Sequence, residues 1–126
     1  MTAAVTVPPV TDDHPRPSPL GGLWAFLGGG MVMAVTVLLL HPVTRQQDCP
    51  NWGGNGNASV FRDPNWDLYL PMMALGWLAL IVAEQVLPIA WRNRPVWMVA
   101  GRGLAALLTA GTLSCCGLLP LETLCH

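Results

Sequence analysis

Three uninterrupted apolar stretches, residues 20–40, 68–91 and 96–119, make up more than half of this chain of 126 residues. The first stretch contains no charged side chain. Each has about twenty residues or more, the length that a helix rising about 1.5 Å per residue needs to cross a hydrocarbon core of roughly 30 Å. The pattern predicts an all-α integral membrane protein with three transmembrane helices.

The composition agrees with this prediction. Hydrophobic residues make up 52% of the chain and charged residues 10%, whereas a soluble domain carries about 25% charged residues. A net charge of −1 argues against nucleic acid as a partner, because phosphate binding requires a clustered basic surface. Lysine is absent and isoleucine occurs only at Ile81 and Ile89, a bias typical of a GC-rich, bacterial genome.

The three stretches leave room for a tail and one loop but for no separate soluble domain. Residues 1–19 contain five prolines and no apolar periodicity, and we expect a disordered tail. Residues 20–126 form the predicted three-span domain, with a single long loop at 41–67. The first apolar run is too long for a cleaved signal peptide, so we expect it to remain as an anchor.

Arginine placement predicts the orientation of the spans in the plasma membrane. Arg92 and Arg94 lie in a tight turn between the second and third stretches, with Arg102 just inside the third. The loop at 41–67 instead contains two arginines and three aspartates. Because cytoplasmic loops are enriched in basic residues beside the membrane, we place the tight turn and the N-terminal tail in the cytoplasm. The long loop and the C-terminus then face outward.

This topology puts all four cysteines on the outer, oxidising side, where disulfides persist. Cys49 lies in the long loop, Cys115 and Cys116 lie at the outer end of the third span, and Cys125 follows it. A bond between the two adjacent cysteines requires an unusual, strained ring. We therefore expect Cys49 to be bridged to one of the two, or to Cys125, and the sequence leaves the pairing open.

A metal site is the alternative interpretation of the same residues, because thiolate and imidazole ligands suit Cu(I) and Zn²⁺. The spacing fits no known ligand motif, so the primary expectation is that no metal is bound. The residues that this alternative would use are His41, Cys49, Cys115, Cys116, Cys125 and His126. A thiol-redox centre at the adjacent pair is disfavoured by its apolar surroundings, which make a thiol inert.

Two opposite charges interrupt the second and third stretches. Glu84 lies seven residues before Trp91 and Arg102 six residues after Val96, so in antiparallel helices both are about 10 Å inside the cytoplasmic boundary. Charges within a membrane face the bundle interior and pair, which predicts an ion pair that locks the two helices together. Gln85 can donate to a helix backbone or to a partner subunit. The alternatives are a proton relay at Glu84 and an Arg102 side chain that reaches to the lipid headgroups.

Small residues recur at four-residue spacing, the pattern that lets helices approach closely in lipid. In the first span these are Ala25 and Gly29, and in the third they form two adjoining lines, Ala106, Ala110 and Ser114 beside Gly101, Ala105 and Thr109. They predict packing within the bundle or docking onto other membrane subunits.

The sequence contains no nucleophile paired with a base, no phosphate-binding loop and no dinucleotide fingerprint. We therefore expect neither enzymatic activity nor a cofactor. The expected partners are membrane lipid and other integral membrane subunits, and the expected function is that of a small non-catalytic subunit or assembly factor of a larger membrane complex. The alternatives are an outer-face copper or thiol-redox protein and a small homo-oligomeric pore.

Overall fold

A computed structural model of the chain describes residues 2–9, 18–49 and 59–125. All regular secondary structure in these ranges is helical, which confirms the all-α part of the prediction for the described chain. The elements are α1 (Trp24–Leu40), the 3₁₀-helix η1 (Gln46–Asp48), α2 (Trp66–Val86), α3 (Pro88–Trp91) and α4 (Val96–Leu124). Of the predicted disordered tail, residues 1 and 10–17 lie outside the described ranges, and residues 2–9 form no helix or strand.

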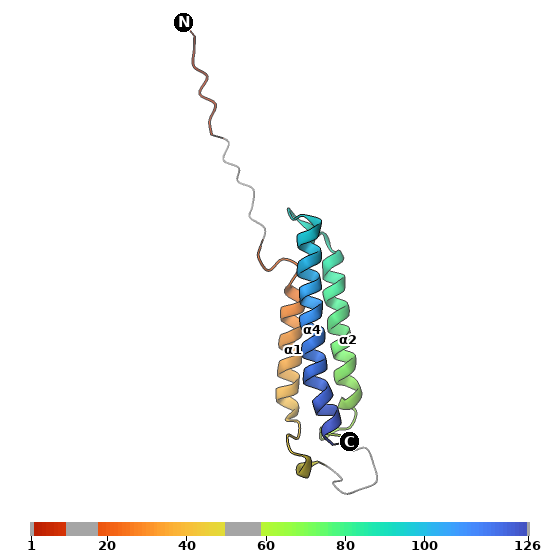
Figure 1. The fold of residues 1–126 in the computed structure, drawn as a ribbon. Coiled ribbons are helices and arrows are strands. Elements are labelled where there is room, and N and C mark those ends of the chain that lie inside the picture. Colours follow the sequence, from red (N-terminus) through yellow and green to blue (C-terminus); the bar gives the residue numbers. More distant parts are fainter. Residues whose placement is uncertain (1, 10–17, 50–58, 126) are drawn as a thin grey trace.

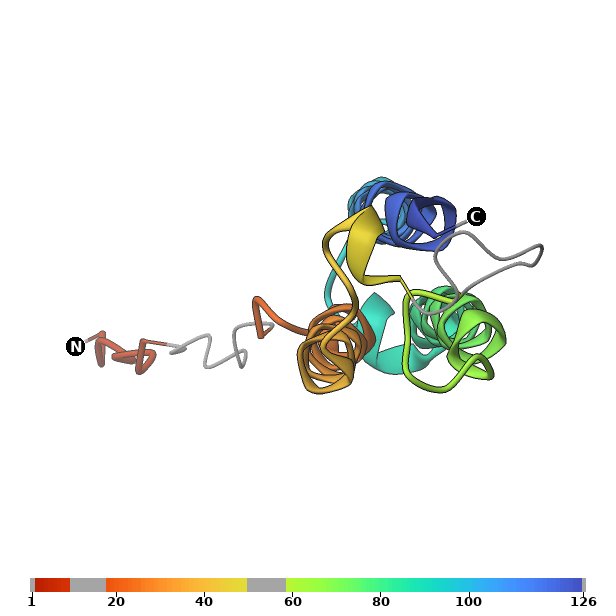
Figure 2. The ribbon, with the colours of Figure 1, turned by 90° about the horizontal axis from the view of Figure 1, so that it is seen from below.

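The helices α1, α2 and α4 lie side by side as a bundle (Figure 1). Seen from the end, they occupy the three corners of a triangle, and η1 lies across the end of the bundle (Figure 2). The turn between α2 and α4 lies at one end, whereas the segment after α1 and the C-terminal end of α4 lie at the other. We call these the turn end and the loop end.

The first helix begins four residues later than the apolar stretch that predicts it. Gly21 and Gly22 are buried, and Gly22 has a φ of +83°. Residues with a side chain rarely adopt this left-handed conformation. The chain therefore turns at residues 18–22 and becomes helical only from Trp24.

The second helix ends at Val86, five residues before the end of its apolar stretch. Leu87 is extended, with φ −69° and ψ 146°, because a proline disfavours the helical conformation of the residue before it. Pro88 then starts the single turn α3, where its missing N–H is no loss. α4 runs past the predicted boundary to Leu124, through Pro120.

In the described part of the chain, α2 with 21 residues and α4 with 29 residues are long and apolar enough to cross a membrane, whereas α1 is a shorter apolar helix of 17 residues. At about 1.5 Å per residue, they are about 32, 44 and 26 Å long. Two candidate spans are thus present, and the third stays a prediction.

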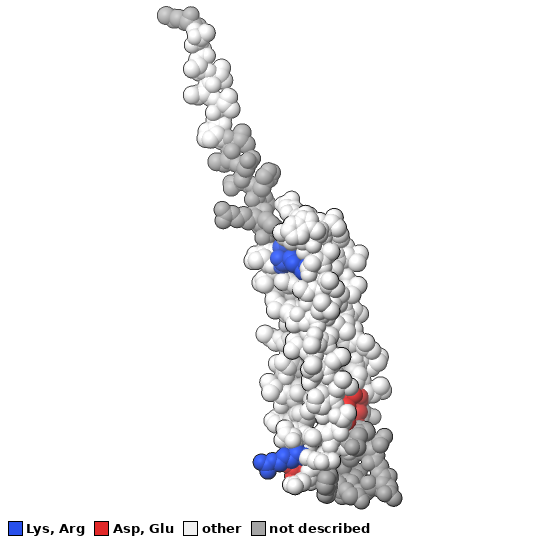
Figure 3. Space-filling model, in the orientation of Figure 1, with Lys and Arg blue, Asp and Glu red and all other residues white. Residues whose placement is uncertain are grey.

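Much of the bundle's outer surface is apolar. Met31, Leu80 and Leu108, one from each long helix, are 71%, 60% and 62% exposed. On the face shown in Figure 3, charged side chains gather towards the ends of the bundle, and its middle carries none. An apolar surface this extensive is typical of a site that contacts lipid or protein.

The described core consists of two clusters. Near the middle of the bundle, Trp77 and Ile81 of α2 pack on Ala106 and Ala110 of α4. At the loop end, a second cluster joins the loop to all three long helices. Its fully buried members are Val60, Phe61 and Leu70. The small alanines let α4 approach α2 closely.

Candidate functional site

Four polar side chains surround the N-terminal end of α1 at the turn end of the bundle. They are Glu84 and Gln85 of α2, Arg94 before α4, and Arg102 of α4. We call them the polar cluster. Each bonds to backbone groups of residues 18–25. Because an unsatisfied backbone group inside a membrane costs several kcal/mol, these bonds fix the place where α1 begins.

The Glu84 carboxylate caps α1 from a neighbouring helix. Its two oxygens accept hydrogen bonds from the N–H groups of Trp24 at 3.0 Å and Ala25 at 2.7 Å. Leu23, at the N-cap position, provides no side-chain acceptor of its own. The first N–H groups of a helix have no partner within it, and the helix dipole is positive there. These N–H groups and the helix dipole therefore stabilise the carboxylate of Glu84, a residue that is only 9% exposed.

The three other members of the polar cluster donate to backbone carbonyls of the turn. Gln85 Nε2 donates to the oxygen of Gly22 at 2.5 Å, a backbone acceptor in the turn before α1, whereas the sequence suggested one in a helix. Arg94 donates to the oxygens of Gly21 and Ser18. Arg102 Nη2 donates to the oxygen of Pro19.

The structure does not bring Glu84 and Arg102 together as the predicted ion pair. Glu84 binds the first N–H groups of α1, whereas Arg102 binds a carbonyl of the turn before α1, and no bond joins the two side chains within the described residues. Arg102 Nε is buried and has no hydrogen-bond partner among the described residues. The reason for the difference is that the start of α1 offers free N–H and C=O groups to both charges.

Trp77 of α2 holds the next turn of α1. Its Nε1–H donates to the carbonyl oxygens of both Ala25 and Phe26, with N···O distances of 3.1 Å. Its ring stacks on that of Phe26 with centroids 5.9 Å apart. A Cβ atom added to Gly29 would lie 2.1 Å from Trp77 Cδ1. The glycine in the predicted packing motif of the first span is therefore required for α1 to lie against the indole ring.

At the loop end, Cys49 and Cys125 form a disulfide, with Cα atoms 5.7 Å apart. This is one of the pairings that the sequence left open. It ties the segment after α1 to the end of α4. Cys115 and Cys116 are free and exposed on α4.

The residues of the metal alternative are not assembled in the structure. Cys49 and Cys125 are joined to each other, and His41 Nδ1 hydrogen-bonds to the Leu39 oxygen at 2.9 Å. The described residues include no group of three or more potential metal ligands. His126 lies outside the described residues.

The two lines of small residues on α4 have different surroundings. Ala106 and Ala110 are buried in the core against α2, and Ser114 Oγ is buried without a hydrogen-bond partner in the described chain. Gly101 and Ala105, on the adjoining line, are exposed.

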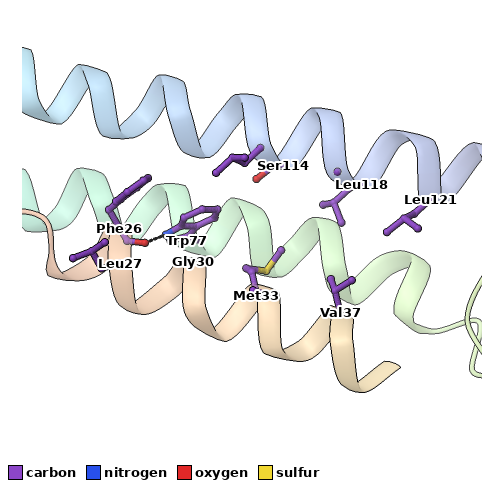
Figure 4. A pocket seen from close by; sticks show the side chains of 12 residues that line it. Phe26, Leu27, Gly30, Met33, Val37, Trp77, Ser114, Leu118 and Leu121 are labelled. Atoms are coloured by element: carbon purple, nitrogen blue, oxygen red, sulfur yellow. Dashed lines mark hydrogen bonds between the residues drawn. The ribbon is translucent and has the colours of Figure 1, made fainter. Parts of the chain in front are cut away.

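An apolar cavity of about 480 Å³ lies between α1 and α4, with Trp77 at its inner wall (Figure 4). Its lining combines small and large side chains, among them Phe26, Gly30, Met33, Ser114, Gly117 and Leu121. A second depression of about 460 Å³ adjoins it towards the turn end and shares Phe26 and Leu27. Arg102 lines this second depression.

Comparison of the chain with protein-family models, with curated proteins and with solved structures finds no match.

Sequence reasoning missed two parts of this site. It gave Trp77 no role and treated Arg94 only as a topology marker. The one available signal is the pair Gly21 and Gly22, which shows that the first apolar stretch need not be helical from its start.

Proposed function

We propose that this protein is a three-span plasma-membrane protein that serves as a small, non-catalytic subunit or accessory factor of a larger membrane complex. Its N-terminus is cytoplasmic and its C-terminus lies outside. The turn end, with Arg92, Arg94 and Arg102, faces the cytoplasm, in keeping with the positive-inside rule.

The contacts of α1 support the third span. α1 is bonded near its N-terminus to Glu84 and packs through its middle on Trp77. Its C-terminal half contributes Met33, Val37 and Leu40 to the cluster around Leu70, near the start of α2. α1 thus follows α2 over most of its length, so if α2 crosses the bilayer α1 crosses with it.

The observation that carries the accessory role is a line of small side chains on the outer face of α4. These side chains are exposed, and we call them the outer small-residue line: Gly101, Ala105, Thr109, Thr112 and Cys116. Ala105 and Thr109 also lie at the edge of the depression between α1 and α4. The hydroxyls of Thr109 and Thr112 donate to carbonyls of their own helix, so neither hydroxyl hydrogen needs a partner outside α4.

Packing within the bundle accounts for one of the two neighbouring glycines of α4 but not for Gly101, which belongs to the outer small-residue line. A Cβ atom at Gly103 would meet the Gln85 side chain at 3.0 Å, so that glycine is explained by internal packing. A Cβ atom at Gly101 would meet nothing within 4 Å. Small residues at this spacing favour close contact between helices in lipid, and the second helix is supplied by a partner.

The test is purification in mild detergent of the native protein, Gly101→Ile and Gly76→Ile. Gly76 on α2 is the matched control, because a Cβ atom there also meets nothing within 4 Å. We expect all three proteins to fold, and the native protein and Gly76→Ile to bring down membrane partners in fixed ratio. Gly101→Ile should lose them. A native protein that runs as a clean monomer without partners contradicts the proposal.

A further inference from the structure

We propose that the groove between α1 and α4 binds an anionic phospholipid, with the phosphate on Arg102 and one acyl chain along the groove. The groove consists of the two adjoining depressions that share Phe26 and Leu27. This proposal requires the bundle to lie in a bilayer, but it does not require a protein partner.

Charge complementarity identifies the headgroup. A guanidinium group has five N–H donors, and Arg102 uses one of its nitrogens on the Pro19 oxygen while its Nε is buried without a partner in the described chain. The Glu84 carboxylate is bonded to the N–H groups of α1 and not to Arg102. Within the described ranges no carboxylate hydrogen-bonds to Arg102, and phosphate is the anion that a guanidinium binds best in a bidentate manner.

The lining of the groove identifies the tail. Apart from Arg102 and Thr109, the residues around the second depression are apolar, and the Thr109 hydroxyl is bonded to the Ala105 oxygen. Leu23, Phe26 and Leu27 form its α1 side. A surface of this kind offers hydrocarbon contacts next to one cationic group. It is complementary to a phospholipid, in which an acyl chain is joined to a phosphate.

The length of the groove suits an acyl chain. The two depressions extend along α4 from Arg102 to Leu121, roughly 28 Å at 1.5 Å per residue. From Arg102 to Leu113 the groove runs about 16 Å along α4. An acyl chain whose phosphate is bound by the Arg102 side chain therefore meets an apolar surface along its path.

The experiment is native mass spectrometry of the full chain after incubation with equimolar phosphatidylglycerol and phosphatidylcholine of the same acyl chains. We expect the native protein to retain phosphatidylglycerol preferentially. Arg102→Met should reduce that preference on the order of tenfold, the loss of one charged hydrogen-bonded contact. Arg92→Met is the matched control, because Arg92 is exposed at the same end of the bundle but does not line the groove. Its preference should stay unchanged.

A second variant tests the groove itself and covers the case in which Arg102→Met does not fold. Thr109→Phe places a ring in the depression while Arg102 stays in place, and it should lower the retention of both lipids. The proposal is overturned if Arg92→Met loses as much preference as Arg102→Met, which would indicate general surface charge. It is also overturned if Thr109→Phe retains both lipids fully, or if a photo-crosslinker at Leu27 captures a polypeptide in place of a lipid.

Discussion

Replacing Glu84 by glutamine should loosen the first turn of α1 and leave the rest of the bundle folded. The carboxylate accepts from two N–H groups, at 3.0 Å and 2.7 Å. Glutamine keeps one oxygen acceptor and turns an NH₂ donor toward the second N–H. The loss of one charged hydrogen bond costs about 1.5–3 kcal/mol, and loss of the charge at a partly buried helix end costs up to about 2 kcal/mol. Because the two terms overlap, we expect a total of about 2–4 kcal/mol.

Hydrogen exchange in detergent micelles measures this change directly at the amides of Trp24 and Ala25. A loss of about 2–4 kcal/mol in the free energy of local opening corresponds to exchange that is about 30-fold to 700-fold faster. Glu122→Gln is the control, because it removes the same charge from a carboxylate that makes no hydrogen bond to the described residues. Unchanged exchange at both amides in Glu84→Gln would refute the capping role.

The double variant Glu84→Gln with Arg102→Met separates this account from the predicted ion pair. If the two side chains were paired, Arg102→Met would remove the guanidinium that Glu84→Gln leaves without its partner, and it would restore much of the lost stability. Glu84 instead binds the N–H groups of Trp24 and Ala25, and Arg102 binds the Pro19 oxygen. The double variant should therefore be at least as unstable as Glu84→Gln alone. Recovery in the double variant would show that the pair forms.

Three further predictions concern packing and thiols. Gly29→Ala should lower the free energy of unfolding of the bundle by about 1–3 kcal/mol or more, because the added methyl overpacks against Trp77. Gly28→Ala should have little effect, because nothing lies within 4 Å of the added Cβ. Thermal unfolding in detergent measures both changes. Cys49→Ser opens a bridge between residues 76 positions apart, which chain-entropy arguments put at about 4.5 kcal/mol, and should sensitise the loop end to protease while the helices stay inserted. Thiol counting on unreduced protein should give two free thiols, and mass spectrometry should find a peptide with Cys49 joined to one with Cys125; four free thiols would contradict the bridge.

The all-helical class could be predicted from the sequence because apolar length alone identifies helices that suit a bilayer. The helix boundaries could not. Pro88 ends α2 early because it holds Leu87 in an extended conformation. α1 starts late because residues 18–22 bond to the polar cluster. Such tertiary hydrogen bonds leave no periodic signal in the sequence.

The candidate site, too, could be predicted from the sequence only in part. The residues Glu84 and Arg102 stood out as charges in apolar stretches, so their importance could be predicted from the cost of isolated charges in a membrane. Their partners could not, because the competing acceptors and donors are backbone groups that exist at every position. The position of Trp77 against Gly29 likewise depends on how α1 and α2 align.

The side of the membrane on which each terminus lies tests the three-span proposal most directly. The measurement is the protease accessibility of an N-terminal and a C-terminal epitope tag in intact and in permeabilised cells. Three crossings predict that the C-terminal tag is cleaved in intact cells and that the N-terminal tag is cleaved only after permeabilisation. Both tags on the same side would show that α1 does not cross and would contradict the account.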